Sequence, residues 1–170
     1  MFDVFVAPLR CPGCDTVVAD AEIQTHIRGG SADGSSLTVG FEFNPLRLTT
    51  ERIVGAGYAL VNPPDPGGPI RLLDVWSCPQ CETEQWAMVE IADRKIRGIE
   101  AVTLDPATLE SANFISDTEA DLLAEALTGP VSTASSVEIL RQRLPTSPER
   151  RDSTVVIEGA SSPWYRCSRG

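Results

Sequence analysis

Cys11-Pro12-Gly13-Cys14-Asp15-Thr16 and Cys78-Pro79-Gln80-Cys81-Glu82-Thr83 are two separate segments with one shared pattern, Cys-Pro-x-Cys-acid-Thr. In a Cys-x-x-Cys turn both sulfur atoms face one point, and a proline in second position presets φ near −65° without losing a needed N–H. Two such turns supply four thiolates, the tetrahedral set that zinc takes in structural sites. The repeat therefore predicts a structural Zn²⁺ site made of Cys11, Cys14, Cys78 and Cys81.

The two turns are unusually far apart for a zinc ribbon, because 63 residues separate Cys14 from Cys78. Zinc-ribbon pairs usually lie roughly 15–20 residues apart. Loop-closure entropy makes the longer gap cost only about 1.2 kcal/mol more, whereas structural zinc contributes on the order of 10 kcal/mol in small peptides. The gap is compatible with a metal site if the inserted segment folds by itself.

Other interpretations of the cysteines remain open. Two disulfides would need an oxidising compartment, and the N-terminal segment has Asp3 where a signal peptide would carry basic charge. A redox dithiol would need a Cys-x-x-Cys turn at a helix N-terminus with a depressed thiol pKa, but acids follow both turns and the next residues have the pattern of strands. Iron is the usual substitute for zinc at a four-cysteine site.

The composition gives no catalytic site. A metal held by four cysteines has no open coordination position for water or substrate. His26 is the only histidine, so a multi-histidine metal centre is excluded, and no nucleophile motif accompanies it. We therefore expect no catalytic residues and interpret His26 as an ordinary sheet residue.

Apolar periodicity indicates a chain that is mainly β before residue 105. Alternating or continuous apolar runs predict strands at 1–9, 16–27, 37–43, 53–61, 70–76, 85–92 and 96–104. The stretch 62–69 contains four prolines and is expected to be a loop. Trp76 and Trp86 flank the second cysteine turn and are expected to pack over the metal site.

Helix signals begin at Asp105-Pro106, where an N-cap residue precedes proline in the first helical position. Ser116 with Glu119 fits a capping box, and Ser135 with Glu138 gives another start signal. We expect Leu122, Leu123, Ala126 and Leu127 to form one helix face.

The predicted fold class is thus mainly β, α+β overall: a zinc-ribbon-like four-cysteine site with a long β-rich insert between its turns, plus a small C-terminal helical segment. The expected domains are a β domain at 1–104, a helical appendage at 105–145 and a flexible or partner-ordered tail at 146–170.

Charge limits the choice of partners. The chain of 170 residues has 14 Lys and Arg against 24 Asp and Glu, a formal charge of −10. This charge disfavours nucleic-acid binding that rests on overall positive potential and favours basic partners. No apolar run reaches the ~18 residues of a membrane span, so we expect a cytoplasmic protein with a protein partner, no nucleic acid and no membrane. Trp164, Tyr165 and Arg166 are candidate partner-binding residues, because these residue types lead among interface hot spots.

The paired Cys-Pro-x-Cys turns resemble the CpXC family of bacterial proteins. The resemblance covers roughly residues 1–130 and rests on Cys11, Pro12, Cys14, Cys78, Pro79 and Cys81. It implies a metal-binding, ribbon-like fold followed by a more helical part. The family carries no reaction, substrate or catalytic residue over to this chain.

The functional hypothesis is a zinc-stabilised, non-catalytic binding or accessory protein that engages a protein partner. The alternative is a thiol redox protein or sensor that uses a Cys-x-x-Cys pair or Cys167.

Overall fold

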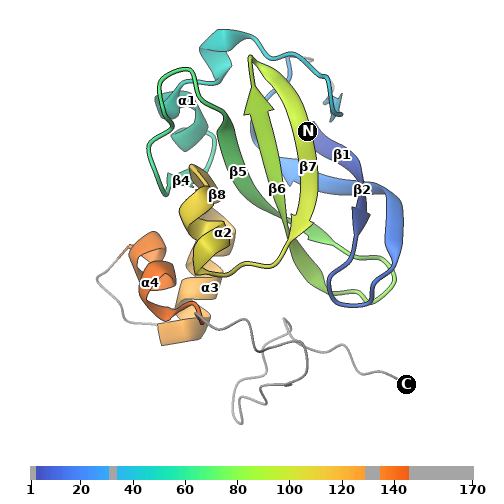
Figure 1. The fold of residues 1–170 in the computed structure, drawn as a ribbon, viewed down its shortest axis with the longest axis vertical. Helices are drawn as coiled ribbons and strands as arrows, with labels where there is room; N and C mark the ends of the chain where they lie inside the picture. The colour runs from blue at the N-terminus through green and yellow to red at the C-terminus, as the bar shows by residue number, and fades with distance from the viewer. Residues whose placement is uncertain (1–2, 31–33, 129–134, 146–170) are drawn as a thin grey trace.

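The structure, a computed structural model, describes residues 3–30, 34–128 and 135–145 (Figure 1). The chain is mainly β with a curled sheet and a few helices, which confirms the coarse fold class. Its elements in chain order are β1 Asp3–Arg10, β2 Val17–Thr25, β3 Ser36–Leu37, the 3₁₀ helix η1 Pro45–Arg47, α1 Thr50–Val54, β4 Tyr58–Leu60, β5 Ile70–Ser77, β6 Glu84–Ala92, β7 Lys95–Val102, α2 Pro106–Ser111, β8 Phe114–Ser116, α3 Asp117–Thr128 and α4 Ser136–Arg143.

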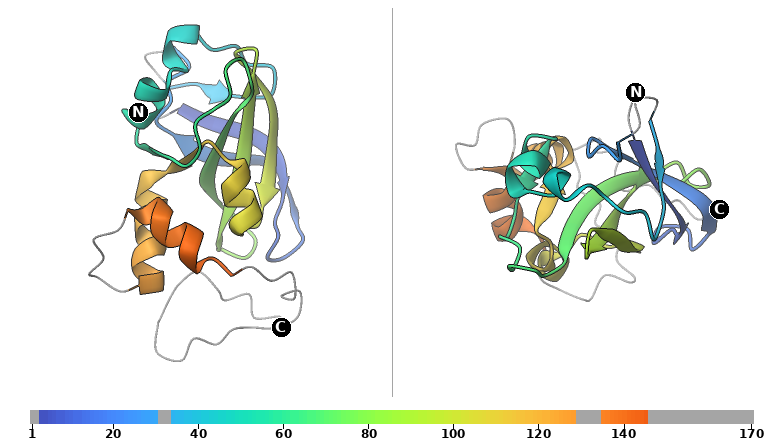
Figure 2. Two further views of the ribbon diagram at one scale, coloured as in Figure 1. Left: turned by 60° about the vertical axis from the view of Figure 1, so that its left-hand side comes forward. Right: turned by 90° about the horizontal axis from the view of Figure 1, so that it is seen from above.

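The sheet has the strand order β3-β1-β2-β5-β6-β7 and curls so that its two ends approach each other (Figure 2). The segment 36–43 joins these ends. Its first residues pair with β1 in parallel, and farther along, the N–H of Ile96 in β7 donates to the Phe41 carbonyl at 3.1 Å. Edge groups that would otherwise be exposed are thereby hydrogen-bonded.

β5 lies at the centre of this sheet. It pairs with β6 along its whole length, and its other edge pairs with β8 at Leu72 and Leu73 and with β2 at Trp76. Leu72 faces one hydrophobic cluster and Leu73 the other. Burial on both faces explains why the neighbouring residues Leu72 and Leu73 are both apolar, where a strand with one solvent-exposed face would alternate.

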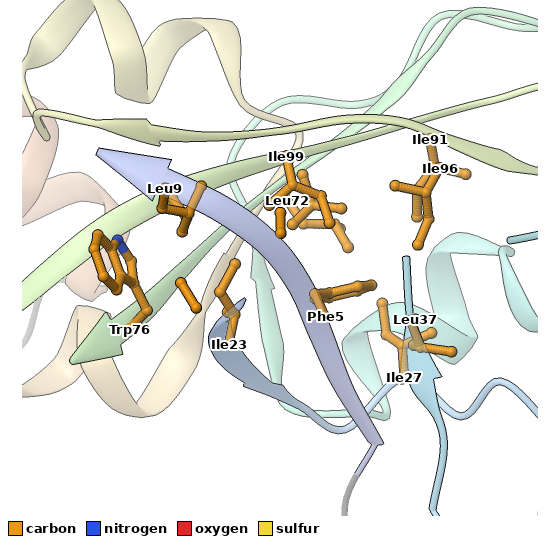
Figure 3. Close-up of a cluster of buried hydrophobic side chains, with 14 of the residues drawn as sticks. Phe5, Leu9, Ile23, Ile27, Leu37, Leu72, Trp76, Ile91, Ile96 and Ile99 are labelled. Atoms are coloured by element: carbon orange, nitrogen blue, oxygen red, sulfur yellow. The ribbon is translucent and has the colours of Figure 1, made fainter. Parts of the chain in front are cut away.

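The first hydrophobic cluster fills the inside of the curled sheet (Figure 3). Its largest members include Phe5 from β1, Ile23 from β2, Leu72 and Trp76 from β5, and Ile96 from β7. Cys11 and Cys78 are fully buried in the same cluster. The metal-site cysteines are therefore continuous with the core and not attached to its surface.

The second cluster lies between the outer face of β5, β6 and β7 and helices α2, α3 and α4. Asp105 caps α2, with its carboxylate accepting from the Thr108 N–H at 2.7 Å, and Ser135 caps α4 through the Glu138 N–H. Two of the three predicted helix starts are thus confirmed with their caps. At the third, α3 begins at Asp117, directly after Ser116, which ends β8. The segment 105–145 also contributes β8, a strand with no expectation from sequence.

The predicted face of α3 is wrong in part. Ala120 and Ala124 are buried, whereas Leu122 is 48% exposed. Leu123 and Leu127 do pack against the second cluster, as predicted. The buried face is therefore centred on the alanines, with these two leucines at its side.

Two predicted strands are also wrong over most of their length. The segment 37–43 turns at Gly40, whose φ of +91° is a left-handed conformation that favours glycine, and Val39 is 57% exposed. The apolar run 53–61 is split because Thr49 caps a short helix that includes Ile53 before β4 begins at Tyr58. A Thr N-cap was the sequence signal for this helix.

Within the described ranges, none of the helices has the length and apolar character needed to cross a membrane.

Candidate metal centre

Each Cys-x-x-Cys turn joins two antiparallel strands. The first turn connects β1 to β2 and the second connects β5 to β6, and both turns lie at the same end of the sheet (Figure 1). The strand pairs that the sequence predicted on each side of the turns are therefore present.

The four sulfur atoms form one compact group. All four Sγ atoms lie within 4.8 Å of one another, and the Cys11–Cys81 and Cys14–Cys78 distances are both 3.7 Å. A disulfide would need about 2.05 Å, and all four residues are free thiols. Because a tetrahedral ion with Zn–S bonds of 2.3 Å spaces its sulfurs about 3.8 Å apart, the donor set fits a zinc-sized ion.

The two turns have the same backbone geometry. In the first, the Cys11 N–H donates to the Thr16 carbonyl at 2.9 Å and the Asp15 N–H to the Cys11 carbonyl at 2.9 Å. In the second, Cys78 and Thr83 bond in the same way at 3.0 Å, and the Glu82 N–H reaches the Cys78 carbonyl at 2.8 Å. The shared six-residue pattern therefore encodes a shared turn.

The acidic position of the pattern has a backbone role. Asp15 and Glu82 have φ values of 62° and 54°, a left-handed conformation that costs a non-glycine residue about 1–2 kcal/mol. Asp15 also pairs with Arg10 at 2.9 Å, away from the sulfurs. These acids close the turns, and neither belongs to the sulfur group.

The threonine of the pattern is a functional residue that the sequence argument missed. The Thr83 hydroxyl lies 2.9 Å from Cys81 Sγ, with either atom able to donate, and the Gln85 amide donates to the same oxygen at 2.7 Å. The hydroxyl is thus placed to donate to a Cys81 thiolate. Thr16 hydrogen-bonds Cys14 through its hydroxyl and backbone N–H and lowers the pKa of that thiol. The repeated threonine in the sequence was the available signal.

The first and second cysteines of each turn have different environments. Cys11 and Cys78 are buried, and Cys14 and Cys81 are half-buried. Burial raises the pKa of Cys11 to about 12, against opposing N–H groups of Cys14 and Gly13. For Cys81, burial acts to raise the pKa, but the Thr83 hydroxyl and N–H outweigh it and lower the pKa to about 6.

The aromatic prediction holds for one tryptophan only. Trp76 is 2% exposed and lies in the cluster that contains Cys11 and Cys78 (Figure 3). Trp86 packs instead with the second cluster beneath the helices.

His26 directly follows β2 and is exposed. The candidate partner-binding residues Trp164, Tyr165 and Arg166, with Cys167 and the rest of the predicted tail, lie outside the described residues.

A second polar group is buried where β2 and β8 separate along the edge of β5. The Tyr58 hydroxyl donates to Asp74 Oδ2 at 2.5 Å and lies 2.7 Å from the Thr25 hydroxyl. The Val75 N–H donates to Asp74 Oδ1 at 3.0 Å. Burial raises the pKa of Asp74 to about 7, with the Tyr58 and Val75 hydrogen bonds opposing. This group could not be predicted from sequence, because Tyr58 and Thr25 are far from Asp74 along the chain.

A cleft of about 820 Å³ opens beside this polar group. Burial raises the pKa of Glu84 and of Glu119, and the pKa of Glu119 is raised further by the charges of Glu84 and Asp117. Asp20, Glu22, Asp74, Glu84 and Glu119 all line this cleft, and its described lining includes no Lys or Arg. Its charged side chains are thus acidic, and a positively charged group placed here would relieve the repulsion between the carboxylates.

Comparisons of this chain with protein-family models, with curated proteins and with solved structures found no match.

The threonine contact can be tested by Thr83→Val, which keeps the side-chain shape and removes the hydroxyl bound to Cys81. Groups that hydrogen-bond metal ligands typically contribute 10–100-fold to metal affinity, so we expect a loss of about tenfold, measured by competition with a chelator. Thr83→Ser should retain wild-type affinity, as should Thr103→Val at an exposed threonine. Equal affinity of Thr83→Val and wild type would contradict this role.

The raised pKa of Asp74 predicts a pH-dependent stability. The folded state holds the proton more tightly than the unfolded state, whose carboxyl titrates near its ordinary pKa of 3.8. The contribution of Asp74 to folding stability is therefore fully present below pH 3.8 and is lost as pH rises through about 7. In urea unfolding between pH 5 and 8, the free energy of unfolding of wild type should fall, relative to that of Asp74→Asn, by up to about 1.4 kcal/mol per pH unit. Parallel curves for the two proteins would rule out this assignment.

Proposed function

We propose that this chain is a zinc-stabilised, non-catalytic binding or accessory protein that engages a protein partner. The observation that carries the proposal is the position of the sulfur group relative to the sheet. β2 and β5 share one registered pair, Ile23 with Trp76, so the seam between the β1–β2 and β5–β6 hairpins has little hydrogen bonding of its own. An ion bound to two cysteines from each hairpin would cross-link that seam.

The donor set supports a structural role in preference to catalysis. Four thiolates from Cys11, Cys14, Cys78 and Cys81 would complete a tetrahedral shell, and the ion would supply cross-linking and no Lewis-acid chemistry. The same set also suits iron. We propose zinc because four cysteines are its usual ligand set in structural sites. The two Cys-x-x-Cys hairpins are the basis for proposing a zinc-ribbon-like site and membership of the CpXC family.

A thiol redox function is the competing proposal. The low pKa of Cys81, about 6, favours a reactive thiolate. Against it, the two 3.7 Å sulfur contacts both run between the turns, from Cys11 to Cys81 and from Cys14 to Cys78. That arrangement suits an ion shared by the turns better than a disulfide within one Cys-x-x-Cys pair.

Cys14→Ser tests the structural role of the metal, with Cys167→Ser as the matched control. A structural zinc site contributes on the order of 10 kcal/mol, and the free energy of unfolding of a typical domain is about 5–15 kcal/mol. Loss of the ion through removal of one ligand should therefore cost most of the folding stability. We expect Cys14→Ser to lose its zinc, measured by elemental analysis, and to lose most of its soluble yield or melting temperature. Cys167→Ser should match wild type in both.

Thiol titration of the native protein separates this proposal from the redox alternative. Four thiols that react only after a chelator is added support a structural ion. A disulfide that forms and is reduced reversibly in the folded wild-type protein, or a metal-free Cys14→Ser that folds normally, would overturn it.

Partner binding is tested by affinity capture with the full chain, identification of the captured protein and measurement of the purified complex. We expect one stoichiometric protein partner, bound non-catalytically. A Trp164→Ala/Tyr165→Ala variant should weaken binding about 30-fold or more, because interface hot spots contribute at least 2 kcal/mol. A folded, metal-loaded chain that binds no partner, or a variant that binds as wild type does, would contradict the corresponding part of the proposal.

A further inference from the structure

A pocket of about 560 Å³ lies on the side of the molecule where β2 ends and where η1 and α1 pass. Three arginines from three separate segments line it: Arg28 after β2, Arg47 in η1 and Arg52 in α1. Glu51 is the acidic side chain in the lining. In a chain of net charge −10, this pocket has an excess of positive charge.

The charges of two of these arginines are not neutralised within the described part of the chain. Six ion pairs occur there, and neither Arg47 nor Arg52 takes part in one. The Glu51 carboxylate therefore lies beyond 4.0 Å from both guanidinium groups. Arg47 and Arg52 are also exposed, so their donors are available to a ligand.

Arg28 and Arg47 are held close together. Arg47 Nη1 donates to the backbone carbonyl of Arg28 at 3.3 Å. Arg28 has a long contact of 3.9 Å to Asp3, but that buried carboxylate already accepts the N–H groups of Gly29 at 2.5 Å and Ser35 at 2.8 Å. Asp3 therefore holds the turn after Arg28 and partly balances the charge of Arg28, so the uncompensated charge of the pocket is that of Arg47 and Arg52.

Positive side chains that line one pocket repel one another, and an anion bound among them would relieve that repulsion. Each guanidinium presents a planar fork of N–H donors that matches two oxygens of a phosphate. The remaining lining includes Ile27, Leu46 and Ala56, and Leu46 is 73% exposed. The pocket thus combines a site for a compact anion with an apolar wall beside it.

We propose that this pocket binds a small phosphomonoester with an apolar body, the phosphate contacting Arg47 and Arg52 and the apolar part lying against Leu46. Such a site is independent of the metal centre. The ligand is a small molecule, because the overall charge of −10 repels an extended polyanion such as a nucleic acid.

Phenyl phosphate is the probe for this site, titrated into the zinc-loaded full chain at low ionic strength and followed by amide NMR shifts. We expect saturable shifts in the residues around Arg28, Arg47 and Arg52, and tighter binding than for inorganic phosphate. The double variant Arg47→Gln/Arg52→Gln should bind at least tenfold more weakly. Arg143→Gln, at an exposed arginine on α4 that also has no ion pair in the described chain, should bind as wild type does.

Two further arms make the result specific. Arg52→Lys keeps the charge but loses the fork, so intermediate affinity supports recognition by guanidinium geometry. Unchanged melting temperatures show that the variants are folded. Equal binding by the double variant, identical shifts with sodium chloride at the same ionic strength, or tighter binding of a short oligonucleotide than of phenyl phosphate would overturn the proposal.

Discussion

The hydrogen-bonded pairing of β5 with β2, β6 and β8 is the constraint on which the other features depend. Its pairing with β6 makes the hairpin that presents Cys78 and Cys81, and its pairing with β8 anchors the segment that continues into α3. The gap between β2 and β8 along its edge contains Asp74. The middle of β5 is buried on both faces, as its neighbouring residues Leu72 and Leu73 show. The sulfur group, the buried carboxyl and the helical layer thus all depend on one central strand.

The sulfur group lies at a seam of this sheet that has little strand pairing. The β1–β2 and β5–β6 hairpins are each well registered, but they meet through one registered pair, Ile23 with Trp76. Cys11 and Cys78 are fully buried members of the inner cluster, so solvent has little access to the group from the core side. Residues 36–43 belong to the insertion between the two turns and close the curled sheet. Because this part of the insertion is ordered in the sheet, it adds little to the loop-closure entropy of bringing the turns together.

Sequence reasoning located what depends on local pattern. The repeated hexapeptide identified the four cysteines, and capping residues at Asp105 and Ser135 located α2 and α4. It failed where tertiary contacts override periodicity: the run at 37–43 turns at Gly40, and β8 exists because β4 and β5 supply partners for a three-residue strand. The buried Asp74 was likewise hidden, because its partner Tyr58, and Thr25 which contacts Tyr58, are distant in sequence and meet only through the fold.

The formal charge of −10 describes the whole chain but no single site. The acidic cleft and the arginine pocket both reach His26 at the end of β2, so opposite charges are concentrated on neighbouring parts of the surface. At physiological ionic strength a charge is screened beyond about 8 Å, so a small ligand in either hollow experiences mainly the side chains that line it. An extended polyanion spans many such lengths and meets the net negative surface. Net charge therefore disfavours an extended polyanion as a partner, and it does not oppose a compact anion in the proposed site to the same degree.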